Sequence, residues 1–230
     1  WEMMRIRGVS KYGIANHYPT PKIYGDFIPT LRKEIDDLDN PNILLGVELE
    51  LDEPRGINKL PKNRQKLLDY IIGSAHRQPN GFLELSNIQP EEIQDFFNDF
   101  RLILINGFKN IPIKIWGHPF LQEFQRFGDK FWTNYIKPLY NECLEVCAER
   151  GIAIELTSAY HSKCNNQPST FKVLDEMYAL AMKNRDVLFA TSSDAHNLRL
   201  LGDLTIPFEY VKKFNIPDSR IIEIEKKYSY

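Results

Sequence analysis

Six side chains of the types that bind metal ions recur in order along this chain. They are His17, Glu48, His76, His118, Asp194 and His196. A single histidine near a strand end is more often structural than a metal ligand. Here, however, four of the five histidines stand at the carboxyl ends of predicted strands. Imidazole and carboxylate groups together suit zinc, iron or manganese, and a carboxylate can bridge two cations. The pattern therefore predicts a multinuclear metal site.

The elements that must position these residues are short apolar, β-branched runs alternating with longer helix-like stretches. The predicted strands are Tyr12–Ala15, Ile43–Leu49, Tyr70–Ala75, Ile111–Trp116, Ile152–Leu156 and Val187–Thr191. Near-continuous apolar runs are typical of a parallel sheet buried on both faces. In barrels built from strand–helix units, active sites assemble at the carboxyl ends of the strands. The candidate ligands fall at that end.

Helix signals separate these strands. Pro90-Glu91-Glu92 has the proline and acidic residues of a first helical turn. A second helix is predicted over Asp129–Arg150, ended by Gly151 and interrupted at Pro138. A third is predicted over Ser169–Asn184. The repeated strand–helix order, without a linker or repeat, predicts an α/β fold and one domain over residues 1–230.

Composition excludes several classes of protein. The chain has 29 basic and 31 acidic residues, a formal net charge of −2, so its overall charge gives no sign of the basic face that duplex DNA or an anionic membrane requires, although it permits a local basic patch. No apolar run is long enough to cross a membrane, and no secretory signal is visible. Cys143, Cys147 and Cys164 cannot form a full disulfide framework. We therefore expect a cytoplasmic protein.

Five motifs carry a resemblance to a known family. They are Ile14-Ala15-Asn16-His17, Gly46-Val47-Glu48, Ile72-Gly73-Ser74-Ala75-His76, Trp116-Gly117-His118-Pro119 and Ser193-Asp194-Ala195-His196. In this order, over nearly the whole chain, they resemble the successive motifs of the polymerase and histidinol phosphatase (PHP) family. The resemblance implies a distorted (βα)7 TIM-like barrel that hydrolyses phosphate esters at a trinuclear centre of two to three divalent zinc, manganese or iron ions.

The resemblance also implies separate roles for the six residues. Glu48 would bridge two metals, and His76 and His118 would hold one of that pair. Asp194 would bind the other, while His17 and His196 would contribute to a third. Glu50 has no family role, and we expect it to support a ligand or face solvent.

Two departures from the family pattern stand out. The family's first strand, which ends in His-x-His, is absent from this chain. The opening residues Trp1–Gly8 instead read as the end of a helix closed by a glycine, so we expect the protein to begin upstream. Asn16 stands where many members have aspartate, and the loss of charge would alter the tuning of His17.

The expected function is hydrolysis of a small-molecule phosphate monoester, as in histidinol phosphatases, by a metal-bound hydroxide. Arg77, directly after His76, would clamp the phosphate or else be a solvated loop residue. His161 would donate a proton from the rim or be a plain loop histidine. Alternatives are a catalytically impaired binding or regulatory module, a nuclease acting on phosphodiesters, and a metal-dependent C–N hydrolase, for which no lysine is suitably placed. The oligomeric state is left open.

Overall fold

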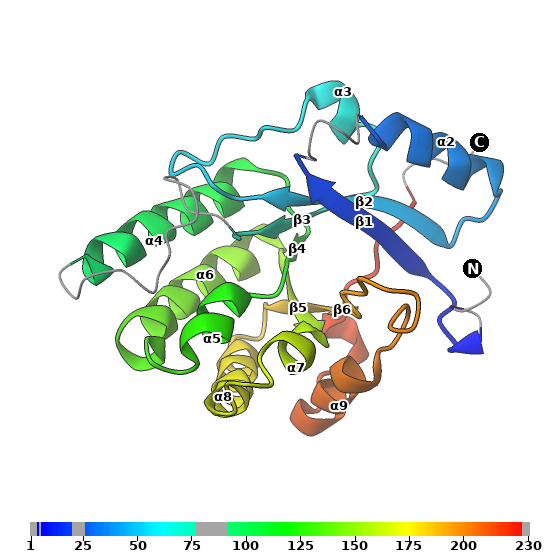
Figure 1. The fold of residues 1–230 in the computed structure, drawn as a ribbon. Helices are drawn as coiled ribbons and strands as arrows, with labels where there is room; N and C mark the ends of the chain where they lie inside the picture. Colours follow the sequence, from blue (N-terminus) through cyan, green and yellow to red (C-terminus); the bar gives the residue numbers. More distant parts are fainter. Residues whose placement is uncertain (1–3, 5, 20–25, 77–91, 227–230) are drawn as a thin grey trace.

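Six parallel strands form a curled sheet in this computed structural model, which describes residues 4, 6–19, 26–76 and 92–226. Their spatial order follows their order in the chain, and each pairs in parallel with the next (Figure 1). The strands are β1 Tyr12–Tyr18, β2 Ile43–Glu50, β3 Tyr70–Ser74, β4 Ile115–Trp116, β5 Ala153–Thr157 and β6 Leu188–Ser192. An unbroken series of parallel neighbours places all six carboxyl ends at one end of the sheet.

Helices connect the strands and cover the outside of the curl (Figure 1). They are α2 Ile28–Asp37, α3 Lys62–Gln65, α4 Ile93–Asn110, α5 Leu121–Phe127, the π-helix Trp132–Ile136, α6 Lys137–Arg150, α7 Ala159–Lys163, α8 Ser169–Lys183, α9 Thr205–Phe214 and the 3-10 turn Asp218–Arg220. The strand–helix alternation confirms the α/β class predicted from the sequence. The curled sheet has six strands in the described residues, so closure into a seven-stranded barrel stays a prediction.

Alternation along each strand divides the apolar side chains between two cores. On β2, Leu45, Val47 and Leu49 belong to the large core that the helices cover, whereas Leu44 belongs to a smaller core inside the curl. On β5, Ile154 faces the large core and Ala153 the small one. Because side chains alternate along a strand, even positions of β2 and odd positions of β5 face inward.

The inner core is built around Tyr70 of β3. Its ring lies against two glycines of neighbouring strands, since a Cβ on Gly13 or Gly46 would come within 2.2 or 2.3 Å of Tyr70 atoms. The ring thus occupies space that any larger residue at these positions would fill. Leu44 and Ala153 complete this part of the interior. The Gly46-Val47-Glu48 motif is therefore partly a packing requirement.

The segment after α9 returns to the free side of β6. Ile221 forms a parallel bridge with Phe189, and the Ile222 N–H donates to the Phe189 carbonyl at 2.8 Å. Further on, Lys226 pairs with Asp36 of α2 at 3.4 Å. The end of the described chain thus begins a pairing with β6 and then reaches the opposite side of the curl.

The fourth predicted strand, Ile111–Trp116, was too long. Only Ile115 and Trp116 pair with both neighbouring strands. Ile111 instead donates to Gly107 of α4, and Ile113 donates to Ile111. The residues are buried and apolar, as a strand requires, but their backbone hydrogen bonds close the end of a helix and a tight turn.

The first predicted strand was too short, because β1 continues through Asn16 and His17 to Tyr18. The helix predicted over Asp129–Arg150 divides into the π-helix and α6, with Pro138 in the first turn of α6. Gly151 ends α6 in the left-handed conformation, as predicted. The predicted helix start at Pro90-Glu91 lies outside the described residues.

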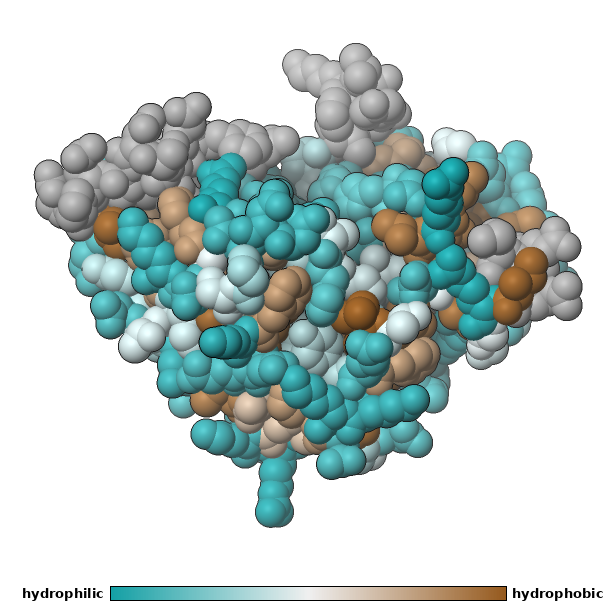
Figure 2. Space-filling model, turned by 60° about the horizontal axis from the view of Figure 1, so that its bottom comes forward, coloured by the Kyte–Doolittle hydropathy of each residue, from teal (hydrophilic) through white to brown (hydrophobic). Residues whose placement is uncertain are grey.

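The three cysteines are buried and form no disulfide, and Cys143 and Cys147 pack in the large core. No helix among the described residues is long and apolar enough to cross a membrane. The face presented in Figure 2 is mainly hydrophilic, with small apolar areas between polar side chains.

Candidate metal centre

Inward-facing positions near the strand ends place the candidate ligands together. β1 and β2 pair so that His17 lies directly beside Glu48. Both residues follow the inward register of their strands, which Ala15 and Leu44 share in the inner core. His17 therefore lies within β1 and not, as the sequence predicts, after it. The cause is backbone pairing, which continues along β2 past Glu48.

Four of the six predicted ligands form one compact cluster. The Nε2 atoms of His76 and His118 lie 3.1 Å apart, and they lie 3.3 and 3.0 Å, respectively, from Glu48 Oε1. The other Glu48 oxygen, Oε2, is 3.4 Å from His17 Nδ1. His17, Glu48 and His76 each offer one ligand atom within 4.8 Å of the others, as a shared ion requires. Both oxygens of Glu48 thus have imidazole neighbours.

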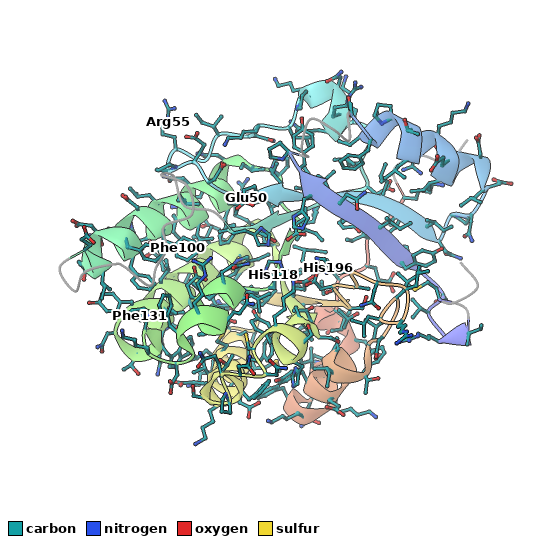
Figure 3. The ribbon with its side chains drawn as sticks, viewed as in Figure 1. Glu50, Arg55, Phe100, His118, Phe131 and His196 are labelled. Atoms are coloured by element: carbon teal, nitrogen blue, oxygen red, sulfur yellow. The ribbon has the colours of Figure 1, made fainter. Side chains whose placement is uncertain are left out.

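Glu50 contacts both the ring and the backbone of His76. Its Oε2 lies 3.1 Å from His76 Nδ1, and its Oε1 accepts the His76 backbone N–H at 2.6 Å. Because a carboxylate only accepts, the hydrogen of the ring belongs on Nδ1, which leaves the Nε2 lone pair directed at the cluster. Glu50 thus supports a candidate ligand, one of the two roles expected for it. Figure 3 labels Glu50 and shows where it lies relative to His118.

Glu155 of β5 fixes the backbone of His118 in a similar way. The His118 N–H donates to Glu155 Oε2 at 2.6 Å, and the Glu155 residue is 4% exposed. His118 has a φ of +23°, a conformation that costs a residue with a side chain roughly 1–3 kcal/mol. The turn that directs this imidazole inward is thus held by a buried carboxylate. Sequence reasoning missed Glu155, although a charge inside the apolar run Ile152–Leu156 was a usable signal.

Asp194 and His196 form a second group after β6. The His196 Nδ1 atom lies 2.9 Å from the Asp194 carbonyl oxygen, which can only accept, so Nε2 of this ring is left free to bind a metal. Asp194 has a φ of +45°, and its Oδ2 accepts from Lys163 Nζ at 3.0 Å. The carboxylate also acts electrostatically on His118. The structure places this pair beside the four-residue cluster without a direct bond to it.

Glu48 and His118 change each other's pKa within the cluster. Burial by itself raises the pKa of Glu48, but the hydrogen bond from His118 and the charges of three histidines outweigh it and hold this pKa well below its usual range. Burial lowers the pKa of His118, whereas the hydrogen bond and charge of Glu48 raise it to about 9. The carboxylate is therefore ionised across the physiological range. Because a metal ion binds a neutral imidazole, an ion bound beside this carboxylate would displace the proton that Glu48 stabilises on His118.

Two further residues, Arg77 and His161, were predicted to contribute to the site. Arg77 lies outside the described residues. His161 belongs to α7, and its ring packs against those of Phe171 and Tyr210 at centroid distances of 4.8 and 6.1 Å. Burial lowers its pKa. These contacts support the structural alternative for His161, although in a short helix and not in a loop.

Replacing Glu155 with alanine should lower the free energy of unfolding by about 1–3 kcal/mol, because the buried His118 N–H would lose its acceptor. Urea unfolding followed by circular dichroism measures the change. Glu155→Gln, which keeps an acceptor oxygen, is the matched control and should cost less. Equal stability of the alanine variant and the wild type would contradict the role assigned to this carboxylate.

Comparison with known proteins leads to phosphatases. No family model matches the sequence. The chain is 28% identical over 220 residues to a probable phosphatase of Caldanaerobacter subterraneus subsp. tengcongensis, covering 89% of this chain and 75% of the relative. In fold it is similar to the crystal structure of histidinol phosphate phosphatase from Lactococcus lactis subsp. lactis complexed with zinc, L-histidinol and phosphate. The TM-score is 0.61 at 13% identity, covering 98% of this chain and 90% of that one. The histidinol-phosphatase-like resemblance predicted from the motifs is confirmed.

Proposed function

We propose that this chain is a metal-dependent phosphatase that hydrolyses a phosphate monoester of a small molecule. The observation that carries the proposal is the triangle formed by Glu48 Oε1, His76 Nε2 and His118 Nε2, with sides of 3.0, 3.1 and 3.3 Å. Ligands bonded at zinc distances in a tetrahedron are about 3.3 Å apart. The three atoms are thus spaced as they would be around one ion, and their chemistry fits zinc, manganese or iron.

The remaining donors fit additional ions. Glu48 Oε2 and His17 Nδ1, 3.4 Å apart, offer ligands beside the first ion, so that Glu48 would bridge. Asp194 and His196 would complete a centre of two to three ions, in the roles that the family resemblance implies. Divalent ions bound there lower the pKa of coordinated water and neutralise the phosphate oxygens.

The chain's own residues contribute orientation and charge. Glu50 and Glu155 hold the ring of His76 and the backbone of His118, which keeps both Nε2 atoms directed at one point. The carboxylate of Glu48 supplies negative charge between close cations. Arg77 remains our candidate for the phosphate clamp. The relative and the structural neighbour support this proposal because each is described as a phosphatase.

Three broader predictions accompany this function. They are the seven-stranded barrel, the single domain over residues 1–230 and the cytoplasmic location. L-histidinol phosphate is the first substrate to test, because the structural neighbour is a histidinol phosphate phosphatase whose complex holds L-histidinol and phosphate.

Metal removal tests the proposal. The purified full-length protein should contain about two to three divalent transition ions per chain and hydrolyse 4-nitrophenyl phosphate. Chelation should reduce turnover to background, and added zinc or manganese should restore it, since bound ions would supply the activated water. Elemental analysis measures the metal content. The same assay on bis(4-nitrophenyl) phosphate, a diester, distinguishes a monoesterase from a nuclease.

Full turnover by a folded, metal-free protein would contradict the metal-dependent mechanism. A protein that binds its ions but turns over neither monoesters nor diesters would instead favour the binding or regulatory module.

A further inference from the structure

Lys163 is a lysine that contacts Asp194, one of the candidate ligands of the metal centre. It is the last residue of α7, the short helix after β5, and its Nζ donates to Asp194 Oδ2 at 3.0 Å. Its side chain is 33% exposed and that of Asp194 is 14% exposed. A second link joins the same two loops, because Ser158 Oγ donates to the Asp203 carbonyl at 3.3 Å. The ammonium group is thus held over the centre from a neighbouring strand's loop.

We propose that Lys163 is a phosphate-binding residue, which leaves Asp194 when a divalent ion takes that carboxylate and then pairs with the substrate's phosphate. The inference rests on the proposed function. It assigns a residue that the motifs of the sequence do not single out.

Charge competition at Asp194 is the first step of the argument. The oxygen that accepts from Lys163 has lone pairs that a metal ion would also need. A divalent ion repels an ammonium group a few ångströms away, so the two cations oppose each other at this carboxylate. The ion carries the larger charge and binds directly, whereas the ammonium is held by one hydrogen bond at a partly exposed position.

The reach of lysine is the second step. Its ammonium is a compact charge with three donors on a flexible four-carbon stem, so it can turn from one oxygen to another without a change in the backbone. A phosphate monoester carries nearly two negative charges and three acceptor oxygens. When it binds at the metal centre it brings a new acceptor close to the released ammonium group.

The proposal implies that the affinities for the metal ion and for phosphate depend on each other. Without phosphate, Lys163 opposes metal binding; with phosphate, the same charge stabilises the complex of protein, metal and phosphate. Phosphate should therefore strengthen metal binding by more than its direct contact with the ions accounts for, and metal should strengthen phosphate binding to the same extent.

The test compares Lys163→Gln with Lys213→Gln. The control removes the same charge and breaks an ion pair of the same type. This pair joins Lys213 Nζ of α9 to Asp175 Oδ1 of α8 at 2.6 Å. Titration calorimetry gives the affinity for zinc without phosphate, and then the affinity of the zinc-loaded protein for inorganic phosphate. The KM and kcat for 4-nitrophenyl phosphate are measured alongside.

Lys163→Gln should bind zinc at least as tightly as the wild type when phosphate is absent. Its zinc-loaded form should bind phosphate roughly 10- to 100-fold more weakly, the loss expected for a hydrogen bond between charged groups. KM should rise by more than kcat falls. Lys163→Arg should recover most of the phosphate affinity, and Lys213→Gln should match the wild type throughout.

Weaker zinc binding by Lys163→Gln would overturn the inference, because it would show that the lysine only braces the loop of Asp194. Phosphate affinity equal to that of the control would also overturn it. If the wild type binds zinc and hydrolyses the ester while both glutamine variants behave alike, the Lys163 assignment fails and the proposed function stands. If the wild type binds no metal and has no turnover, both fail.

Discussion

Replacing Glu48 with glutamine should reduce the kcat for 4-nitrophenyl phosphate at least about 1,000-fold, because the proposed centre loses the carboxylate shared by its ions. Glutamine has nearly the same shape as glutamate, so the packing around the carboxyl end of β2 is retained. A neutral amide cannot balance two close cations. The three histidines within 3.4 Å of Glu48 would also lose the negative charge that they surround. We therefore expect lower metal content together with lower turnover.

Turnover, elemental analysis and far-ultraviolet circular dichroism together check this result. Glu53→Gln is the matched control, since Glu53 lies three residues after the end of β2 in the following loop and pairs only loosely with Lys59, at 3.9 Å. The control should keep normal metal content and activity. Unchanged turnover in Glu48→Gln with a normal spectrum would refute the bridging role of Glu48.

Replacing Asp69 with alanine should lower the free energy of unfolding by about 2–5 kcal/mol, because two buried N–H donors lose a charged acceptor. Asp69 Oδ2 accepts from Arg32 Nη1 at 3.0 Å and from the Leu45 N–H at 2.8 Å. Arg32 is 5% exposed and Asp69 3% exposed. The substitution therefore removes the acceptor of one guanidinium N–H and of a strand N–H, while Arg32 keeps its pair with Asp36.

Urea unfolding at a fixed metal concentration measures this loss. The control is Glu142→Ala, which breaks the exposed pair with Arg101 at 2.5 Å and should cost about 0–1 kcal/mol. Asp69→Asn keeps an acceptor for Leu45 and should fall between the two. A loss in Asp69→Ala no larger than in Glu142→Ala would show that the Arg32–Asp69 pair contributes little.

Much of the fold could be predicted because each strand carries a local signal. Short apolar runs of four to seven residues predicted five of the six strands to within a few residues. The exception, β4, shows the limit of such a signal. Ile111 and Ile113 are as buried as strand residues, yet their backbone groups bond within a turn. Hydropathy reports burial and cannot report which backbone groups pair.

The candidate centre was predictable to a similar extent. Metal-ligand side chains at strand ends are visible in a sequence, and the parallel order of strands brings those ends together. The roles of Glu50 and Glu155 were harder to predict, because each accepts from the backbone N–H of a residue that follows a neighbouring strand. Such a bond depends on the register between strands, which the residues of one strand do not specify.

The sequence by itself determined which chemistry is available: the imidazoles and carboxylates, their alternation along strands, and so the end of the sheet where they gather. Only the tertiary structure decided how they combine. The curl of the sheet brings β2, β3 and β4 close enough for Glu48, His76 and His118 to form one triangle. It also brings Lys163 over Asp194. These contacts join residues from 28 positions apart (Glu48 and His76) to 70 positions apart (Glu48 and His118). Such contacts are set by the packing of the whole sheet and its helices.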